Sequence, residues 1–200
     1  MTKLGVLLSG RGSNFQAIAG RVAAGEIPAG ISVVIGNRPE APGLAAAREL
    51  GLQALSIPSK GLDREVYDRQ LIDALRAHEV EWVILAGYMR ILSAEFIRAF
   101  PQRILNIHPS LLPAFPGLDA QHQAFDYGVK VTGCTVHFVD EHLDHGPIVA
   151  QATVPVEPDD TAVTLSARIL TEEHRIYGDS IRRLLTMPWS IEDRRVVFGR

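Results

Sequence analysis

The stretch ILNIHPSLLPAFPG at residues 104–117 places two polar side chains with catalytic potential inside an apolar run. Asn106 and His108 are two residues apart, so on an extended strand both point to one face, roughly 6–7 Å from each other. An imidazole can donate or shuttle a proton near neutral pH, and an amide N–H can stabilise an oxyanion. Together they suit attack on a carbonyl carbon. The alternative is a structural pair that ties down the proline-rich loop.

The sequence favours direct transfer over a covalent enzyme intermediate. The nucleophile motif GxSxG is absent. Cys134, the one cysteine, lies in an apparent strand and is expected in the core. A lone cysteine also excludes an intrachain disulfide and fits a reducing compartment, so we expect a cytoplasmic protein.

A third polar segment, VDEHLDHGPI at residues 139–148, offers a carboxylate partner for His108. A carboxylate close to the imidazole would orient the ring and favour its charged form. The residue types leave Asp140, Glu141 and Asp144 open as candidates, and an ordinary solvated loop is the alternative.

Histidines in and near this segment raise the question of a metal site. They are His137, His142 and His145. Neither HEXXH nor HXXEH occurs, and alternation along a strand turns neighbouring side chains to opposite faces. We therefore expect no metal.

A glycine-rich turn at Ser9–Asn14 follows the first apolar run and opens a helix, with Ser13 and Gln16 in a capping-box pattern. The N–H groups and positive end of a helix favour a phosphate there. GxxxxGK[ST] is absent, and Gly10-x-Gly12 lacks a third small residue, so neither a P-loop nor a dinucleotide site is expected. A single phosphate group fits better; a tight turn without a ligand is the alternative.

Apolar β-rich runs alternate with helical segments along the chain. The expected strands are residues 4–8, 31–35, 54–57, 82–86, 104–107, 132–138 and 148–153. The expected helices are residues 14–24, 43–50, 63–78, 93–100 and 161–185, the last capped by Asp160 or Thr161. This order predicts an α/β fold with an open, mostly parallel sheet and helices on both faces. Ligands would bind beyond the carboxyl ends of the strands.

Composition limits the remaining functions. A chain of 200 residues with 46% hydrophobic content is expected to form one domain over residues 1–200. A net charge of −3 without basic runs disfavours general nucleic-acid binding. No apolar stretch approaches the ~18 residues needed to cross a membrane.

These motifs resemble the glycinamide ribonucleotide formyltransferases, the folate-dependent enzymes of purine synthesis. The resemblance is carried by SGRGSN at 9–14, AGYMRIL at 86–92, ILNIHPSLLPAFPG at 104–117, GCTVHFVDEHLDHGPIVAQ at 133–151 and TEEHRIY at 171–177. It implies a formyltransferase-like variant of the Rossmann fold. It also implies direct transfer of a formyl group from 10-formyltetrahydrofolate to the amine of glycinamide ribonucleotide. A cis bond is expected at Leu112–Pro113, and the chain is expected to be a monomer or a homodimer.

The resemblance also implies individual roles. The catalytic residues would be Asn106, His108 and Asp144. The residues that bind the phosphate and ribose of the ribonucleotide would be Gly12, Ser13, Asn14 and Glu173. The folate-binding residues would be Arg64, Met89, Arg90, Ile91, Leu92, Asn106, Val139, Asp140, Glu141 and Asp144. From residue type alone, Glu173 is a solvated helix charge, and Met89, Ile91 and Leu92 are core residues that follow a strand.

Three alternatives to this function stay open. A formyltetrahydrofolate hydrolase usually carries an extra N-terminal domain, and a methionyl-tRNA formyltransferase usually carries an extra C-terminal domain and a basic surface. Neither is expected for 200 residues with a net charge of −3. A nucleotide-binding sensor that kept the fold would tolerate loss of His108 or Asp144, and both are present.

Overall fold

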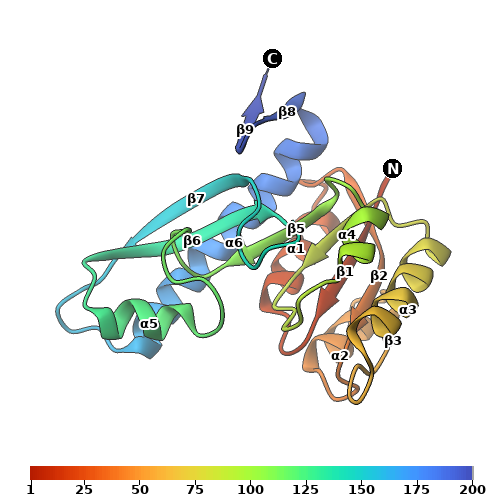
Figure 1. Cartoon of the computed structure of the whole chain (residues 1–200), viewed down its shortest axis with the longest axis horizontal. Coiled ribbons are helices and arrows are strands. Elements are labelled where there is room, and N and C mark those ends of the chain that lie inside the picture. Colours follow the sequence, from red (N-terminus) through yellow and green to blue (C-terminus); the bar gives the residue numbers. More distant parts are fainter. Residues whose placement is uncertain (200) are drawn as a thin grey trace. The chain divides into compact units, whose positions relative to one another are not determined.

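The structure, a computed structural model, describes residues 1–199 in two compact units. The first unit covers Met1–Asn106, and the second begins at Ile107. The elements are labelled in Figure 1. In chain order they are β1 (Thr2–Leu8), α1 (Ser13–Ala23), β2 (Ala29–Gly36), α2 (Pro42–Glu49), β3 (Ala54–Ser56), α3 (Arg64–Ala77), β4 (Trp82–Leu85), α4 (Ala94–Ala99), β5 (Ile104–His108), α5 (Ala120–Tyr127), β6 (Val131–Phe138), β7 (Ile148–Pro155), α6 (Ala162–Thr186), β8 (Trp189–Glu192) and β9 (Arg195–Phe198).

The first unit is built on a parallel sheet with the strand order β3-β2-β1-β4-β5. Connections between parallel strands are right-handed. The chain moves outward from β1 to β3 and then returns to β4 and β5, so α1 and α2 must cover one face while α3 and α4 cover the other. In agreement, α1 contacts α2 and α3 contacts α4 (Figure 1).

The strands of this sheet are apolar on both faces because helices cover both. All four residues of β4 are buried, and so are the last five residues of β1. The loops that follow β1 and β4 diverge at the point where the strand order reverses, which is where open α/β sheets bind ligands. Among residues 1–199, no helix is both long and apolar enough to cross a membrane.

The second unit contains an antiparallel pair, β6 and β7, with helices packed against it (Figure 1). The helix α6 contacts both strands, and α5 contacts α6. The short hairpin of β8 and β9 joins this layer where Arg195 of β9 pairs with Ile148 of β7. Thr161 caps α6 through a reciprocal pair of hydrogen bonds with Thr164, so Thr161 is the cap and Asp160 is not.

The predicted fold class is confirmed, and every predicted strand and helix is present with bounds that differ by at most two residues. The burial of Cys134 in β6 is also confirmed. The sequence analysis did not predict α5 or the β8–β9 hairpin. The helix α5 follows Asp119 in a left-handed conformation, has no side-chain cap and buries only Ala120 and Ala124. It therefore lacks the apolar stripe that marks a helix in a sequence.

Gly133 in β6 is expected to be intolerant of any side chain. A β-carbon built there would lie 1.9 Å from the carbonyl oxygen of Ala152, a backbone atom of the paired strand β7. We expect Gly133→Ala to lower the free energy of unfolding by about 2–3 kcal/mol, because the strands must separate. Urea denaturation followed by circular dichroism measures this change.

The matched control for this variant is Gly20→Ala. Gly20 is exposed on α1, and a β-carbon there meets no atom within 4 Å. Alanine should raise the free energy of unfolding by up to about 1 kcal/mol through its helix propensity. Equal unfolding midpoints for the two variants would contradict the close approach at Gly133.

Candidate active site

The turn between β1 and α1 ends at Gly12, where the backbone conformation favours a glycine. Gly12 is the N-cap of α1 with φ 71°, and a β-carbon there would lie 3.2 Å from Gly43 Cα. The predicted phosphate residues Gly12, Ser13 and Asn14 are therefore the cap and the first two residues of the helix. Backbone N–H groups of a first helical turn point out of the helix end, where the macrodipole favours an anion.

The predicted capping box of Ser13 and Gln16 is wrong. No side chain caps α1. The Gln16 side-chain amide donates to the Arg11 carbonyl at 3.2 Å, and its backbone N–H donates to the Gly12 carbonyl at 2.9 Å. Because the helix begins one residue earlier than a Ser13 cap requires, the Ser13 hydroxyl serves no capping bond.

Two hydrogen bonds join the loops that follow β1 and β4. The Ser9 N–H donates to the Gly87 carbonyl at 3.1 Å, and the Met89 N–H donates to Ser9 Oγ at 2.8 Å. The predicted phosphate loop and the predicted folate segment 89–92 therefore lie next to each other within the first unit. This is the arrangement expected at the reversal of strand order.

From residue type alone, the apolar residues of segment 89–92 were expected in the core, and the structure corrects this expectation for two of them. Leu92 is buried as a core residue should be, but Met89 is 59% exposed and Ile91 is 52% exposed. Two large apolar side chains exposed beside the turn after β1 are typical of a binding surface and not of the core.

A buried carboxylate beneath this segment was missed by the sequence analysis. Asp68 of α3 is buried, and its Oδ2 accepts a hydrogen bond from the Ser93 N–H at 2.6 Å. Burial raises the pKa of Asp68, against the opposing effect of its hydrogen bonds with Ser93 and of the Arg90 charge. The Arg90 guanidinium lies over the Tyr67 ring, 4.9 Å from its centroid. Tyr67 thus contacts Arg90 and Asp68 binds Ser93, and these two contacts attach the segment to α3. The first residue of α3 is Arg64.

In the second unit, His108 and Asp144 are brought together from segments 36 positions apart. His108 Nδ1 lies 3.4 Å from Asp144 Oδ2, and both side chains are buried. His108 Nε2 lies 2.8 Å from the carbonyl oxygen of Phe115. Asn106 precedes His108 by two residues on β5. Both ring nitrogens of His108 thus face oxygen atoms, one from the loop after β5 and one from the loop after β6.

The backbone around Asp144 is shaped to present its carboxylate. Asp144 has φ 49°, in the left-handed region that only a few residue types tolerate. Its Oδ2 accepts a hydrogen bond from the Gly117 N–H at 2.8 Å. His137 Nε2 lies 3.9 Å from its Oδ1. Burial lowers the pKa of His137, so this ring is neutral at neutral pH and its Nδ1 hydrogen goes to the Phe138 carbonyl.

The proline-rich loop is held by a polar network behind His108. Thr135 of β6 donates through its hydroxyl to the Ser110 carbonyl at 2.7 Å and accepts from the Leu112 N–H at 3.1 Å. The Gln151 amide on β7 donates to the Leu112 carbonyl at 3.0 Å. The expected cis bond at Leu112–Pro113 is confirmed. Prolines and cross-strand hydrogen bonds together fix this loop.

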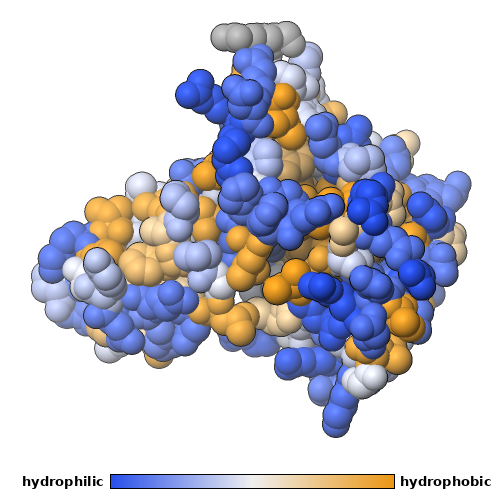
Figure 2. Space-filling view, in the orientation of Figure 1, coloured by the Kyte–Doolittle hydropathy of each residue, from blue (hydrophilic) through white to orange (hydrophobic). Residues whose placement is uncertain are grey.

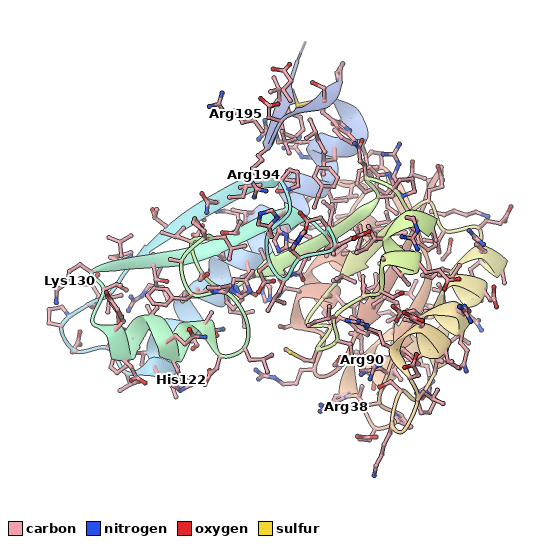
Figure 3. All side chains as sticks on the ribbon, viewed as in Figure 1. Arg38, Arg90, His122, Lys130, Arg194 and Arg195 are labelled. Carbon is pink, nitrogen blue, oxygen red and sulfur yellow. The ribbon has the colours of Figure 1, made fainter. Side chains whose placement is uncertain are left out.

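The other two carboxylates of the 139–148 segment take different partners. Asp140 Oδ2 lies 2.9 Å from His145 Nδ1, and Glu141 is exposed. Arg194, labelled in Figure 3, lies beside this loop from the turn between β8 and β9 and donates to the His145 carbonyl. Of the three candidates, only Asp144 contacts His108 among the ion pairs of residues 1–199.

Glu173 is buried in the structure and is not the solvated charge that its residue type indicates. It lies on the face of α6 that packs against β6, and its side chain is only 6% exposed. Burial and the nearby charge of Glu173 raise the pKa of the Cys134 thiol to about 12. Burial of a carboxylate is costly unless hydrogen bonds or charges compensate for it.

An apolar surface pocket of about 500 Å³ lies elsewhere in the second unit. Its walls come from the proline-rich loop, the end of α5 and the start of β6, where Figure 2 shows apolar surface. Phe115 and Tyr127 meet in this wall edge to face, with centroids 5.8 Å apart. None of the predicted site residues lines it.

Comparison with known proteins assigns the chain to a family. The formyl transferase family model matches residues 2–181. The phosphoribosylglycinamide formyltransferase of Bacillus subtilis is 41% identical over 186 residues, which cover 92% of this chain and 95% of the relative. The trifunctional purine biosynthetic protein adenosine-3 of Drosophila melanogaster is 46% identical, but this chain spans only 14% of its length.

Solved structures agree with this assignment. The crystal structure of glycinamide ribonucleotide transformylase 1 from Symbiobacterium toebii has 50% sequence identity and a TM-score of 0.97, with 100% of this chain and 95% of that chain covered. The match therefore includes the fold, the phosphate turn and the segments that hold His108 and Asp144. This chain belongs to the formyl transferase family and, within it, to the phosphoribosylglycinamide formyltransferases.

Proposed function

We propose that this chain transfers the formyl group of 10-formyltetrahydrofolate to the amine of glycinamide ribonucleotide in de novo purine synthesis. The observation that carries the proposal is the buried contact of His108 with Asp144, at the end of the strand that also holds Asn106. The chain would act in the cytoplasm as one formyltransferase domain over residues 1–200, of which residue 200 lies outside the described residues. It would act as a monomer or homodimer and bind neither nucleic acid nor membrane.

The reaction begins when the amine nitrogen of the ribonucleotide attacks the formyl carbon. A C–N bond forms, and the formyl oxygen becomes an oxyanion. The Asn106 amide and the His108 ring would each donate a hydrogen bond to it, and one such donor is typically worth ~3–4 kcal/mol. The bond from the formyl carbon to the folate nitrogen then breaks, and that nitrogen takes a proton.

Asp144 would hold His108 in the state that this step needs. With Nδ1 turned to the carboxylate, the ring keeps its Nε2–H for the formyl oxygen. In the structure this N–H donates to the Phe115 carbonyl, so the formyl oxygen would replace that carbonyl as acceptor. The carboxylate also stabilises the imidazolium and accepts protons released by the attacking amine, directly or through water.

The ribonucleotide would lie with its phosphate on the first turn of α1. Gly12, Ser13 and Asn14 supply backbone N–H groups and a hydroxyl there, and Gly12 brings the backbone close to the ligand. Glu173 would accept hydrogen bonds from the ribose hydroxyl groups. Its burial supports this role, because a solvated helix charge would not be buried.

The folate substrate would use two sets of residues. In the first unit these are Arg64, Met89, Arg90, Ile91 and Leu92, and the exposure of Met89 and Ile91 fits an aromatic ring system. In the second unit these are Val139, Asp140, Glu141 and Asp144, with Asn106 on β5. The chemistry of this donor set needs no metal ion, because protein hydrogen bonds polarise the formyl group.

The test of the proposed function is an assay with 10-formyltetrahydrofolate in the presence and absence of glycinamide ribonucleotide. We expect tetrahydrofolate to form only when the ribonucleotide is present, because its amine is the nucleophile. Absorbance change and mass spectrometry of the formylated ribonucleotide measure this. Equal deformylation without the ribonucleotide would assign the chain to the hydrolases instead.

The His108→Ala variant tests the proposed oxyanion donor. Turnover should fall by roughly 10²–10⁴-fold, because a general acid and oxyanion donor is lost. The dissociation constant for folate should change little, since the proposed folate-binding residues of segment 89–92 are intact. Steady-state kinetics and fluorescence titration measure the two quantities. The control is His122→Ala, an exposed histidine on α5; full activity of His108→Ala would remove His108 from the chemistry.

The double variant Ser13→Ala with Asn14→Ala tests the phosphate turn. The Michaelis constant for the ribonucleotide should rise by about tenfold or more, because charge-assisted hydrogen bonds to the phosphate are lost. The Michaelis constant for folate should stay within about twofold. Thermal unfolding of the variant controls for damage to α1. A parallel rise in both constants would place the phosphate elsewhere.

A further inference from the structure

Three side chains of the loop between β6 and β7 converge outside the proposed catalytic contact. Asp140, His142 and His145 each offer one metal-ligating atom, and these atoms lie within 4.8 Å of one another. Asp140 Oδ2 lies 2.9 Å from His145 Nδ1, and Asp140 Oδ1 lies 3.9 Å from His142 Nδ1. The His142 and His145 rings are 5.1 Å apart between centroids. Neither histidine has a role in the proposed reaction.

The donor set and its spacing suit a zinc ion. Zinc takes imidazole nitrogens and carboxylate oxygens at about 2.0–2.2 Å in a tetrahedral site, which places neighbouring donors roughly 3.3–3.5 Å apart. The two separations from Asp140, one from each carboxylate oxygen, lie below and above this value, so small side-chain rotations bring the three donors to zinc-binding distance and water supplies the fourth ligand. His142 is 77% exposed, which leaves an open path for the ion. Cys134, the soft ligand of the chain, is buried and does not compete.

The charges around the cluster favour a cation. The loop carries three carboxylates, Asp140, Glu141 and Asp144, and the guanidinium of Arg194 lies beside it. The Asp140 carboxylate faces both histidine rings and offers a cation its oxygen atoms.

We propose that Asp140, His142 and His145 form an inhibitory site for Zn²⁺ on the loop that carries Asp144. The His145 ring now donates its Nδ1 hydrogen to Asp140, and its Nε2 lies 3.1 Å from Arg194. Zinc that binds the ring at Nδ1 displaces this hydrogen. Bound zinc replaces the contact with Asp140 and repels the guanidinium. The contact of Arg194, in the β8–β9 turn, with the His145 ring is then lost. The loop becomes less well fixed, and Asp144, one residue before His145, loses its alignment with His108.

The binding part of this inference does not depend on the reaction, whereas the inhibition part rests on the proposed function. The two parts are therefore measured separately. Isothermal titration of the whole protein with ZnCl₂ needs no turnover. Inhibition is read from the rate of tetrahydrofolate formation at buffered free Zn²⁺, followed by addition of EDTA.

The discriminating variant is His142→Ala, which removes an exposed ligand that the proposed reaction does not use. Wild type should bind one Zn²⁺ per chain with a dissociation constant in the micromolar range, and the variant should bind at least about tenfold more weakly. The matched control is His122→Ala, because His122 also faces a carboxylate, that of Asp119 at 2.5 Å, but has no second histidine in its cluster. The control should bind zinc as wild type does. Mg²⁺, which prefers oxygen ligands, should not compete.

Inhibition should follow occupancy. Wild type and His122→Ala should lose activity along the zinc binding curve and regain it with EDTA, while His142→Ala keeps its activity at the same free Zn²⁺. Zinc binding of equal strength in His142→Ala and wild type, or no saturable binding at all, would overturn the site. Full activity of wild type with the site saturated would overturn the inhibitory role.

Discussion

The contact between the His108 ring and the Asp144 carboxylate depends on two loops of the second unit. The loop after β5 reaches both partners, because the Phe115 carbonyl faces His108 and the Gly117 N–H binds Asp144. The loop after β6 supplies Asp144 itself. A shift of either loop would therefore break the pair, and the hydrogen bonds of Thr135 to the proline-rich loop oppose such a shift. These polar bonds fix the position of both side chains, and the proposed formyl transfer would need that position.

This arrangement lowers stability locally. Asp144 holds a left-handed backbone that is unfavourable for a residue with a β-carbon, and two ionisable side chains are buried with it. A pair of apolar residues would pack there with no desolvation penalty. The surrounding antiparallel strands and α6 provide the packing that offsets this loss. The strained conformation persists because the rest of the unit leaves the loop no better alternative.

The sequence predicts what depends on local patterns and fails where long-range contacts decide. Apolar runs indicate the strands, and the polar pair Asp160 and Thr161 marks the start of α6, although only the structure shows that Thr161 is the cap. Asp68 was missed because an acid within a helix looks solvated until the segment that binds it, through Ser93, is known. The predicted capping box failed for a similar reason. Gly12, and not Ser13, is the N-cap of α1, in a left-handed conformation. Its close approach to Gly43 of α2 is a long-range contact that the local sequence does not show. Residue types indicated His108 but left three carboxylates open as its partner, and the family resemblance selected Asp144, which the structure places in contact with His108.

Two histidines lie within 4 Å of the Asp144 carboxylate, and their surroundings separate their roles. Burial keeps His137 neutral, and its Nδ1 hydrogen is already bound to the Phe138 carbonyl. It therefore offers the carboxylate no positive charge. The His108 ring faces the Asp144 carboxylate through Nδ1 and the Phe115 carbonyl through Nε2. The ring that the proposed reaction would use is the one nearer to the Asp144 carboxylate, at 3.4 Å against 3.9 Å for His137.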